Sequence, residues 1–289
     1  MKNKKVLLIG NRNTGFDIIS KFDFLDIVGI AAVKNSELNN SIISSNIKNK
    51  LIFSFKDREE LFNYIKHNHF DILLTTGCPF ILPISKIKNN DQLFINAHPS
   101  LLPKGRGVHP INEILLMEHK YYGASLHYIE KNVDSGNIIY QKKYPISSDI
   151  NLDLLYYLSF QCEKEVIAEG LLKLKKNFYN YFGKKQIGNP SSFKRSLDKR
   201  IINFKQHSSE DINRVVKAFG IRSQGVYSNI NGRIFKIYET KLIKNNHISV
   251  IFKYKKTASI CLEFDGGVLI KTINGYILIT NFEIVDNME

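Results

Sequence analysis

The stretch FINAHPSLLPKGRGVHP, residues 94–110, places an amide and an imidazole at the end of an apolar run. Asn96 and His98 are separated by one residue, so in a strand both side chains lie on the same face. An amide N–H and a protonated imidazole can each donate a hydrogen bond to a carbonyl oxygen that gains negative charge under nucleophilic attack. The pair therefore suits the activation of a carbonyl group. The alternative interpretation is a hydrogen-bonded strand terminus capped by a histidine.

The loop after this pair has the composition of a pocket wall. Pro103 stiffens the chain, while Gly105 and Gly107 allow backbone conformations that other residues rarely adopt. A carboxylate, Asp134, lies farther along the chain on the polar turn at residues 133–136. A carboxylate on a turn is usually exposed to solvent and has no catalytic function. Asp134 can take part in catalysis only if the fold places it next to His98.

Four apolar runs are interpreted as buried strands that position these loops. They are KKVLLIG (residues 4–10), DIVGIAAV (26–33), FDILLTTG (70–77) and QLFINAH (92–98). Residues 54–68 place Leu61, Phe62 and Ile65 at helical spacing. Apolar strands that alternate with helices are typical of a parallel sheet covered on both faces, with ligands at the carboxyl ends of the strands. This rule places residues 10–15, 77–83 and 96–107 at one edge of the sheet.

The remaining chain predicts two more strands, a long helix and a second domain. Residues 124–146 form two extended segments joined by the turn at 133–136, and residues 151–178 follow a helical period. Residues 183–200 are rich in Gly, Pro, Ser and charge, which is the composition of a linker. We therefore predict an α/β domain with a mostly parallel sheet over residues 1–182, a linker over 183–200, and a small antiparallel, open-barrel-like β domain with one helix over 201–289.

The second domain is marked by a helix start signal and by hairpin turns. Ser208 and Asp211 fit a capping box, and Gly220 supplies the C-cap. The apolar face of this helix consists of Ile212, Val215, Val216 and Phe219. Hairpin turns are expected at Asn231-Gly232, Asp265-Gly266-Gly267 and Asn274-Gly275.

Composition and charge restrict the class of protein. The chain has 289 residues, 43% hydrophobic residues and a net charge of +14, which fit a globular protein of two domains. Its lysines are scattered among Asn and Ile, which disfavours a nucleic-acid partner and is compatible with a phosphorylated substrate. No apolar run approaches the roughly 20 residues of a membrane span, and the run at residues 6–9 is too short for a secretory signal. We therefore expect a cytoplasmic protein without a membrane partner.

Cysteine and histidine spacing predicts no metal site. Cys78, Cys162 and Cys261 are widely spaced and are expected to be reduced thiols. His67 and His69 have no Cys or carboxylate companions, so we expect a solvated helix end there.

The first loop, GNRNTG at residues 10–15, matches no nucleotide-binding fingerprint. It lacks the middle glycine of a dinucleotide motif and the Lys-Ser/Thr pair of a P-loop, so a tight strand-to-helix turn explains its glycines. Arg12 in this loop lies at the expected ligand edge, where a guanidinium can meet a phosphate.

The motifs together resemble those of the folate-dependent formyltransferases, which include glycinamide ribonucleotide, methionyl-tRNA and nucleotide-sugar N-formyltransferases. The resemblance covers residues 1–180, and residues 200–289 resemble, more weakly, the small carboxyl domain of some members. It rests on Asn-Ala-His-Pro-Ser-Leu-Leu-Pro at 96–103, Arg106-Gly107, Pro110 and Val-Asp-Ser-Gly at 133–136. It implies a Rossmann-like catalytic domain and N10-formyltetrahydrofolate as the donor, with no metal.

The resemblance implies a role for each of these residues. Formyl transfer passes through a tetrahedral intermediate, to whose oxyanion Asn96 and a protonated His98 would donate hydrogen bonds. Asp134 would orient His98, raise its pKa so that the ring stays protonated at neutral pH, and take part in removing the proton from the amine. The pteridine ring would lie against Phe80, Ile81, Leu82, Val133 and Asp134.

Three interpretations of the acceptor compete. A methionyl-tRNA enzyme would carry an inserted loop rich in Pro, Arg and Lys after the second strand, whereas residues 33–55 contain neither Pro nor Arg. A relative without catalytic activity is disfavoured because all three catalytic positions are intact. We therefore expect a nucleotide-linked amino-dideoxy sugar, a building block of surface polysaccharides such as lipopolysaccharide O-antigen. The foremost candidate is dTDP-4-amino-4,6-dideoxyglucose, with the 3-amino isomers next and methionyl-tRNA as the alternative.

Contacts to such a substrate are assigned to basic and aromatic side chains. Arg12, Lys104 and Arg106 are the candidates for meeting the diphosphate or the sugar. Tyr227 or Tyr238 of the second domain could stack on the base. The second domain either forms a homodimer interface or covers the core.

Overall fold

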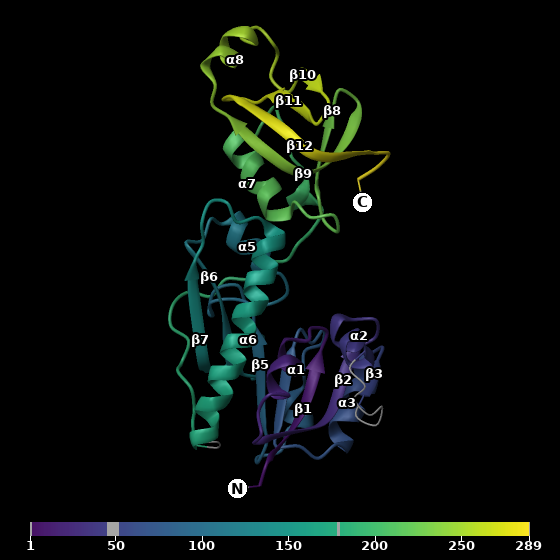
Figure 1. Cartoon of the computed structure of the whole chain (residues 1–289), viewed down its shortest axis with the longest axis vertical. Helices are drawn as coiled ribbons and strands as arrows, with labels where there is room; N and C mark the ends of the chain where they lie inside the picture. The colour runs from purple at the N-terminus through teal and green to yellow at the C-terminus, as the bar shows by residue number, and fades with distance from the viewer. Residues whose placement is uncertain (1, 45–51, 178–179, 289) are drawn as a thin grey trace. The chain divides into compact units, whose positions relative to one another are not determined.

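The computed structural model describes residues 2–44, 52–177 and 180–288, and the chain divides into two compact units. The first unit consists of Met1–Pro110, Tyr121–Pro145 and Tyr157–Ser192. The second consists of Ile111–Lys120, Ile146–Tyr156 and Phe193–Glu289. Figure 1 shows both, with the first unit in purple to teal and most of the second in green to yellow.

The first unit alternates strands with helices along most of its length. Its strands are β1 (Lys4–Gly10), β2 (Leu25–Val33), β3 (Ile52–Phe55), β4 (Ile72–Thr76), β5 (Leu93–His98), β6 (Tyr121–Tyr128) and β7 (Ile138–Pro145). Its short helices are α1 (Thr14–Ile19), α2 (Glu37–Ser44), α3 (Arg58–His67) and α4 (Ile84–Ile87). Two helices, α5 (Pro110–Leu116) and α6 (Leu152–Asn177), contain residues of both units. The long helix predicted over residues 151–178 is confirmed as α6, and Phe178 lies outside the described residues.

The seven strands form one sheet in the order β3-β2-β1-β4-β5-β6-β7. The first five strands pair in parallel, and β6 and β7 join the edge antiparallel. The carboxyl ends of β1, β4 and β5 therefore meet at one edge, as the strand rule requires. The predicted α/β fold class with a mostly parallel sheet is confirmed.

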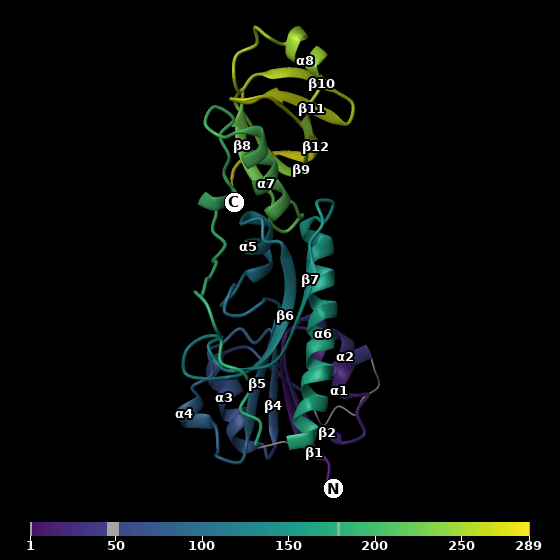
Figure 2. The same ribbon diagram turned by 90° about the vertical axis from the view of Figure 1, so that its left-hand side faces the viewer.

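Both faces of this sheet are buried. Successive residues of each strand point to opposite sides, so each strand contributes to two hydrophobic clusters. Val6 and Leu8 of β1 pack with α1, α2 and α6, whereas Leu7 and Ile9 pack with α3 and α4. Figure 2 shows α1, α2 and α6 on one side of the strands and α3 and α4 on the other. Continuous apolar strands are therefore the correct signature of this doubly covered sheet.

Gly10 is needed where β1 leaves the sheet. Its φ of +152° lies in a region that L side chains rarely adopt, and a Cβ placed there would lie 2.1 Å from the carbonyl oxygen of Thr76. The glycine therefore lets β1 end directly against β4 and brings the loop with Arg12 beside Gly77.

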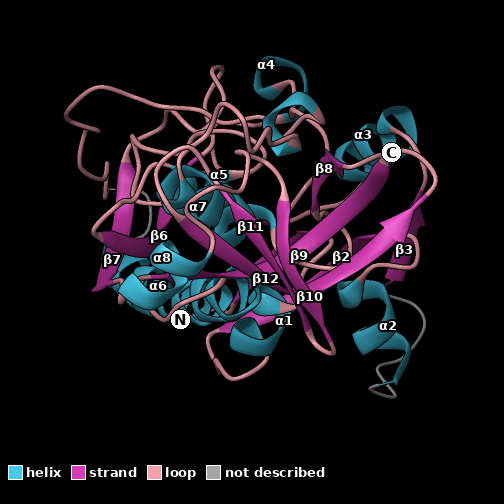
Figure 3. Cartoon of the chain, turned by 90° about the horizontal axis from the view of Figure 1, so that it is seen from above, coloured by secondary structure: helices cyan, strands magenta, loops and turns pink. Residues whose placement is uncertain are grey.

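The second unit is a five-stranded antiparallel sheet with a helix packed on it. Its elements are α7 (Ser209–Phe219), β8 (Val226–Ile230), β9 (Arg233–Ile243), α8 (Asn246–Ile251), β10 (Ile260–Phe264), β11 (Gly267–Lys271) and β12 (Tyr276–Val285). The strand order is β10-β11-β12-β9-β8, and Figure 3 shows the long strands β9 and β12 next to each other. All three predicted hairpin turns connect neighbouring strands of this sheet.

The start of α7 follows the predicted capping box. The Ser208 side chain accepts a hydrogen bond from the Asp211 N–H at 3.0 Å, which satisfies one of the free donors of the helix end. Gly220 is the C-cap, but its φ of −76° is not left-handed. The glycine is required by space instead, because a Cβ would lie 2.1 Å from the carbonyl oxygen of Tyr238.

Candidate active site

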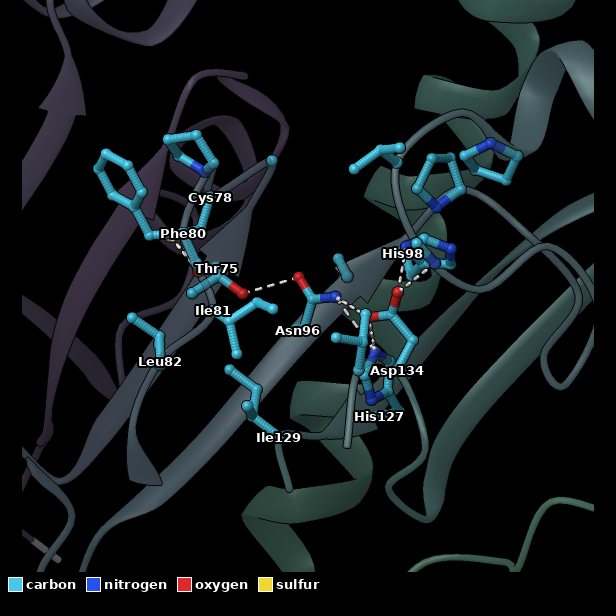
Figure 4. A pocket seen from close by; sticks show the side chains of 18 of the residues that line it. Thr75, Cys78, Phe80, Ile81, Leu82, Asn96, His98, His127, Ile129 and Asp134 are labelled. Atoms are coloured by element: carbon cyan, nitrogen blue, oxygen red, sulfur yellow. Dashed lines mark hydrogen bonds and ion pairs between the residues drawn. The ribbon is translucent and has the colours of Figure 1, made fainter. Parts of the chain in front are cut away.

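The structure brings Asn96, His98 and Asp134 into one cluster, drawn in Figure 4. Asn96 and His98 lie at the end of β5, and Asp134 lies on the turn between β6 and β7. β6 runs antiparallel to β5 and ends at Tyr128 opposite Ile95, and the connection from Tyr128 to Ile138 then places Asp134 beside Asn96 and His98. Asp134 has a φ of +48°, a left-handed conformation that is uncommon for residues other than glycine.

The side-chain amide of Asn96 has a fixed orientation. Its Oδ1 accepts a hydrogen bond from the Thr75 hydroxyl at 2.7 Å. Its Nδ2 lies 3.2 Å from Asp134 Oδ1 and 3.1 Å from His127 Nε2. The bond to Asp134 lies at the upper end of the normal N–H···O range, so an incoming oxygen with developing negative charge can compete for this donor.

His98 is held between a carbonyl and a carboxylate. Its Nε2 lies 2.7 Å from the Gly105 carbonyl oxygen, so this nitrogen carries a proton and donates it. Its Nδ1 lies 3.6 Å from Asp134 Oδ2, which also accepts the Gly107 N–H at 2.8 Å. In the neutral ring Nδ1 is therefore the nitrogen that can accept a proton. The Asp134 carboxylate beside it would stabilise the resulting imidazolium.

The pKa of His98 corrects the sequence-based expectation. Burial lowers the pKa of His98 below the ordinary imidazole value, although the charge of Asp134 acts in the opposite direction. For Asp134, burial would raise the pKa, but the neighbouring His98 and His127 rings and the hydrogen bond from the Gly107 N–H hold it well below the usual range. Burial thus favours the neutral form of the imidazole, and the carboxylate beside it is held as an anion.

Sequence reasoning missed two members of this cluster, Thr75 and His127. Thr75 and His127 flank Asn96 on β4 and β6, in direct register with it. His127 Nδ1 lies 2.8 Å from the Tyr128 carbonyl oxygen and donates to it, so in the neutral ring Nε2 is an acceptor for the Asn96 amide. A polar residue within an apolar strand is visible in the sequence. The sequence does not reveal that Thr75 and His127 lie on the strands next to Asn96.

The cluster forms one wall of a cavity of about 320 Å³. Phe80, Ile81 and Leu82 line it from the loop after β4, and Ile129 and Val133 line it from the β6–β7 connection. Ile81 and Val133 are 68% and 44% exposed, whereas Leu82 is buried. The cavity therefore joins an open apolar wall to a polar wall that holds the amide, the imidazole and the carboxylate (Figure 4).

Two protein-family models match the chain. The model for formyl transferase matches residues 29–171, and the model for the formyl transferase C-terminal domain matches residues 195–287. The chain belongs to the folate-dependent formyltransferase family. It is therefore an enzyme that transfers a formyl group.

Two curated relatives of this formyltransferase are named methionyl-tRNA formyltransferase. It is 28% identical over 283 residues to the methionyl-tRNA formyltransferase of Fusobacterium nucleatum, covering 92% of this chain and 84% of that protein. It is 25% identical to the methionyl-tRNA formyltransferase of Caldicellulosiruptor saccharolyticus, covering 79% of this chain and 71% of that one.

Solved structures with the same fold include sugar N-formyltransferases. WlaRD, a sugar 3N-formyl transferase solved with dTDP and 5-N-formyl-THF, is 23% identical with a TM-score of 0.70 and 99% coverage of both chains. The N-formyltransferase of Helicobacter canadensis, in complex with folinic acid and dTDP-3-aminofucose, is 21% identical with a TM-score of 0.69, covering 97% of this chain and 100% of that one. HypX from Aquifex aeolicus also shares the fold at a TM-score of 0.64, and the formyltransferase spans 44% of its length.

The three basic residues named for the substrate have different surroundings in the formyltransferase. Arg12 lines the cavity, and its Nε and one terminal nitrogen bind the buried carboxylate of Glu163 at 3.0 and 2.5 Å. Lys104 is exposed and is not among the residues that line the cavity. The guanidinium of Arg106 donates hydrogen bonds to the Gln186 side-chain oxygen, and Arg106 is likewise outside the cavity lining.

Two features are absent from the residues that the structure describes. No cluster of three or more His, Cys, Asp or Glu side chains within residues 2–44, 52–177 and 180–288 has the geometry to hold a metal ion. No helix in this part of the formyltransferase is both long enough and apolar enough to span a membrane.

Proposed function

We propose that this formyltransferase moves the formyl group of N10-formyltetrahydrofolate to the amine of a nucleotide-linked amino-dideoxy sugar. The foremost candidate is dTDP-4-amino-4,6-dideoxyglucose. The observation that carries the proposal is the convergence of Asn96, His98 and Asp134 on a cavity whose opposite wall is apolar and open. A flat donor ring and a polar acceptor need such a divided site.

The reaction follows from these positions. The amine attacks the formyl carbon, and the carbonyl electron pair moves onto oxygen, which accepts a hydrogen bond from the Asn96 amide. The proton released by the amine passes to the His98–Asp134 pair, where the neutral ring accepts it at Nδ1 and Asp134 stabilises the imidazolium. The intermediate then collapses: the bond from carbon to N10 breaks, and N10 receives a proton from the same pair.

The donor is proposed to lie against the apolar wall. Phe80, Ile81 and Leu82, with Val133 and Asp134, would form the slot for the pteridine ring. The exposure of Ile81 and Val133 supports this assignment, because large apolar side chains at a cavity mouth lose unfavourable contact with water when a flat ring covers them. Solved relatives with folinic acid or 5-N-formyl-THF support a folate donor.

Folate binding can be tested with a matched pair of variants. Ile81→Asp should raise the Kd for 5-formyltetrahydrofolate by at least about tenfold, since it puts a charge on the apolar wall. Ile43→Asp is the control, because Ile43 is 66% exposed on α2 and does not line the cavity. Equal Kd values for both variants and the wild type, measured by calorimetry, would place the donor elsewhere.

A nucleotide sugar is favoured over tRNA by the segment after β2. Residues 34–56 contain neither Pro nor Arg, and residues 37–44 form α2. Residues 45–51 of the predicted loop position lie outside the described residues. The sugar N-formyltransferases align with this chain over nearly their whole length, which also supports the sugar proposal.

Methionyl-tRNA is the second candidate acceptor. The names of the curated relatives favour it, because one of them matches 92% of this chain. The dependence of acceptor affinity on ionic strength distinguishes the two candidates, since the binding of tRNA should weaken steeply as ionic strength rises. A dTDP-sugar, with its few charges, should respond far less.

For the nucleotide sugar we propose Arg12 as the foremost contact to the diphosphate or the sugar. Glu163 neutralises and orients its guanidinium, and the Nη1 atom lies beside Gly77 at the cavity. Lys104 and Arg106 remain proposals whose side chains lie off the cavity lining.

The acceptor is tested by a substrate panel. The purified protein is incubated with N10-formyltetrahydrofolate and either dTDP-amino sugars or initiator methionyl-tRNA, and tetrahydrofolate release and the mass of the product are followed. The proposal expects a product one formyl group heavier from an amino sugar. Turnover with tRNA alone would contradict it.

A further inference from the structure

The segment from Lys184 to Ser192 is hydrogen-bonded beside the turn that carries Asp134 and to the loop that carries Gly105. At one end Lys184 and Ile138 exchange N–H···O bonds of 2.8 Å, just after the Asp134 turn. At the other end the Ser191 carbonyl accepts the Arg106 N–H at 2.8 Å, and the Ser191 hydroxyl accepts the Gly105 N–H at 2.9 Å. The linker-like composition of this segment gives no sign of these bonds.

Gln186 lies between these two anchor points and uses its whole side-chain amide. Its Nε2 donates to the carbonyl oxygens of Asp134 and Gly136, each at 2.8 Å. Its Oε1 accepts from Nε and a terminal nitrogen of Arg106, at 3.2 and 2.7 Å. A flipped amide would set N–H against N–H and oxygen against oxygen, so the orientation is determined by the partners.

The two loops tied by Gln186 supply both groups that touch the His98 ring. The Gly105 carbonyl binds Nε2, and the Asp134 carboxylate faces Nδ1. Asp134 adopts a left-handed φ of +48°, which costs an L residue about 1 kcal/mol and is kept only where surrounding contacts fix the turn. The bonds from Gln186 to the carbonyls of Asp134 and Gly136 are contacts of that kind.

We propose that Gln186 is a positioning residue for formyl transfer, acting through Asp134. With Arg106 it holds the Asp134 turn and the Gly105 loop in the one arrangement in which Asp134 faces His98. This inference rests on the proposed function of the cluster. It gives Arg106 a role in positioning.

Two substitutions separate the bonds of Gln186. Gln186→Met keeps the length of the side chain and removes every hydrogen bond, whereas Gln186→Glu keeps acceptors for Arg106 and sets an oxygen against the two carbonyls. Both should lower kcat at least about tenfold and change KM for either substrate less than about threefold. Ile187→Ala is the control, because Ile187 is 88% exposed next to Gln186, and it should leave kcat unchanged.

Action through Asp134 is tested by combining variants. In an Asp134→Asn background, Gln186→Met should lower the single-turnover rate by less than about threefold, since the group it positions is already altered. Losses that multiply would overturn the proposal. So would normal kcat in Gln186→Glu, or a rise in KM alone, which would make Gln186 a substrate contact.

A measurement without substrate separates this inference from the proposed function. The Gly107 N–H donates to Asp134 Oδ2, so its hydrogen exchange reports whether the turn stays in place. Exchange of this amide should be at least about tenfold faster in Gln186→Met than in Ile187→Ala, with melting temperatures recorded for both. Unchanged exchange overturns the role of Gln186. Absence of formyl transfer by the wild type, together with faster exchange in the variant, removes the proposed function but leaves the role of Gln186 in holding Asp134.

Discussion

Substitution of Asp134 by Asn tests the electrostatics of the site with little change in shape. The carboxylate lies 3.6 Å from His98 Nδ1, so at an effective dielectric constant of about 20 its attraction to an imidazolium is about 4 to 5 kcal/mol. The amide oxygen of Asn keeps part of this attraction. Because each 1.36 kcal/mol corresponds to a factor of ten, kcat/KM should fall between about 10²- and 10³-fold.

The assay is the initial rate of formylated product at saturating donor, compared with the unfolding free energy of the same variant. The Gly107 N–H can still donate to the Asn oxygen, so stability should change by less than about 2 kcal/mol. Asp23→Asn is the control, since Asp23 is an exposed turn residue of the same unit. A fall in kcat/KM of less than about tenfold for Asp134→Asn would refute the assigned role of the carboxylate.

Three further outcomes are expected. In the pH–rate profile, kcat/KM should fall at acid pH with a midpoint below the ordinary imidazole pKa of about 6.5, because burial lowers the pKa of His98 and the neutral ring accepts the proton of the amine. A midpoint above that value would contradict this. Thr75→Val removes the hydrogen bond to Asn96 Oδ1, worth about 1 kcal/mol, and should lower kcat about fivefold in steady-state assays. An unchanged kcat would mean that Asp134 and His127 suffice to orient the amide. Ser208→Ala removes the N-cap of α7 and should lower the unfolding free energy by about 1 kcal/mol with kcat unchanged, and equal denaturation midpoints would refute the capping role.

Much of the fold could be predicted because local pattern and global burial agree. The apolar runs at β1, β2, β4 and β5 are continuous, as a sheet covered on both faces requires. The N-cap of α7 and the hairpin turns depend on residues that are neighbours in the chain, so their signals are local. The length of α6 follows from its helical period.

The site could be predicted less completely, because its pairings are not local. Asn96 and His98 share one strand end, and their spacing is visible in the sequence. The hydrogen bonds from Thr75 and to His127, in contrast, depend on which strands lie next to β5 and in what register. The pKa of His98 depends on burial, which the sequence gives no means to weigh against the charge of Asp134.

The specificity constant for the acceptor tests the central claim most directly. With N10-formyltetrahydrofolate as donor, kcat/KM should be measured for dTDP-4-amino-4,6-dideoxyglucose, its 3-amino isomers and initiator methionyl-tRNA under identical salt conditions. A nucleotide-linked amino sugar should exceed the tRNA by at least about 10³-fold, since binding sites that fit one acceptor leave polar groups of the other unpaired. A larger value for the tRNA would contradict the account.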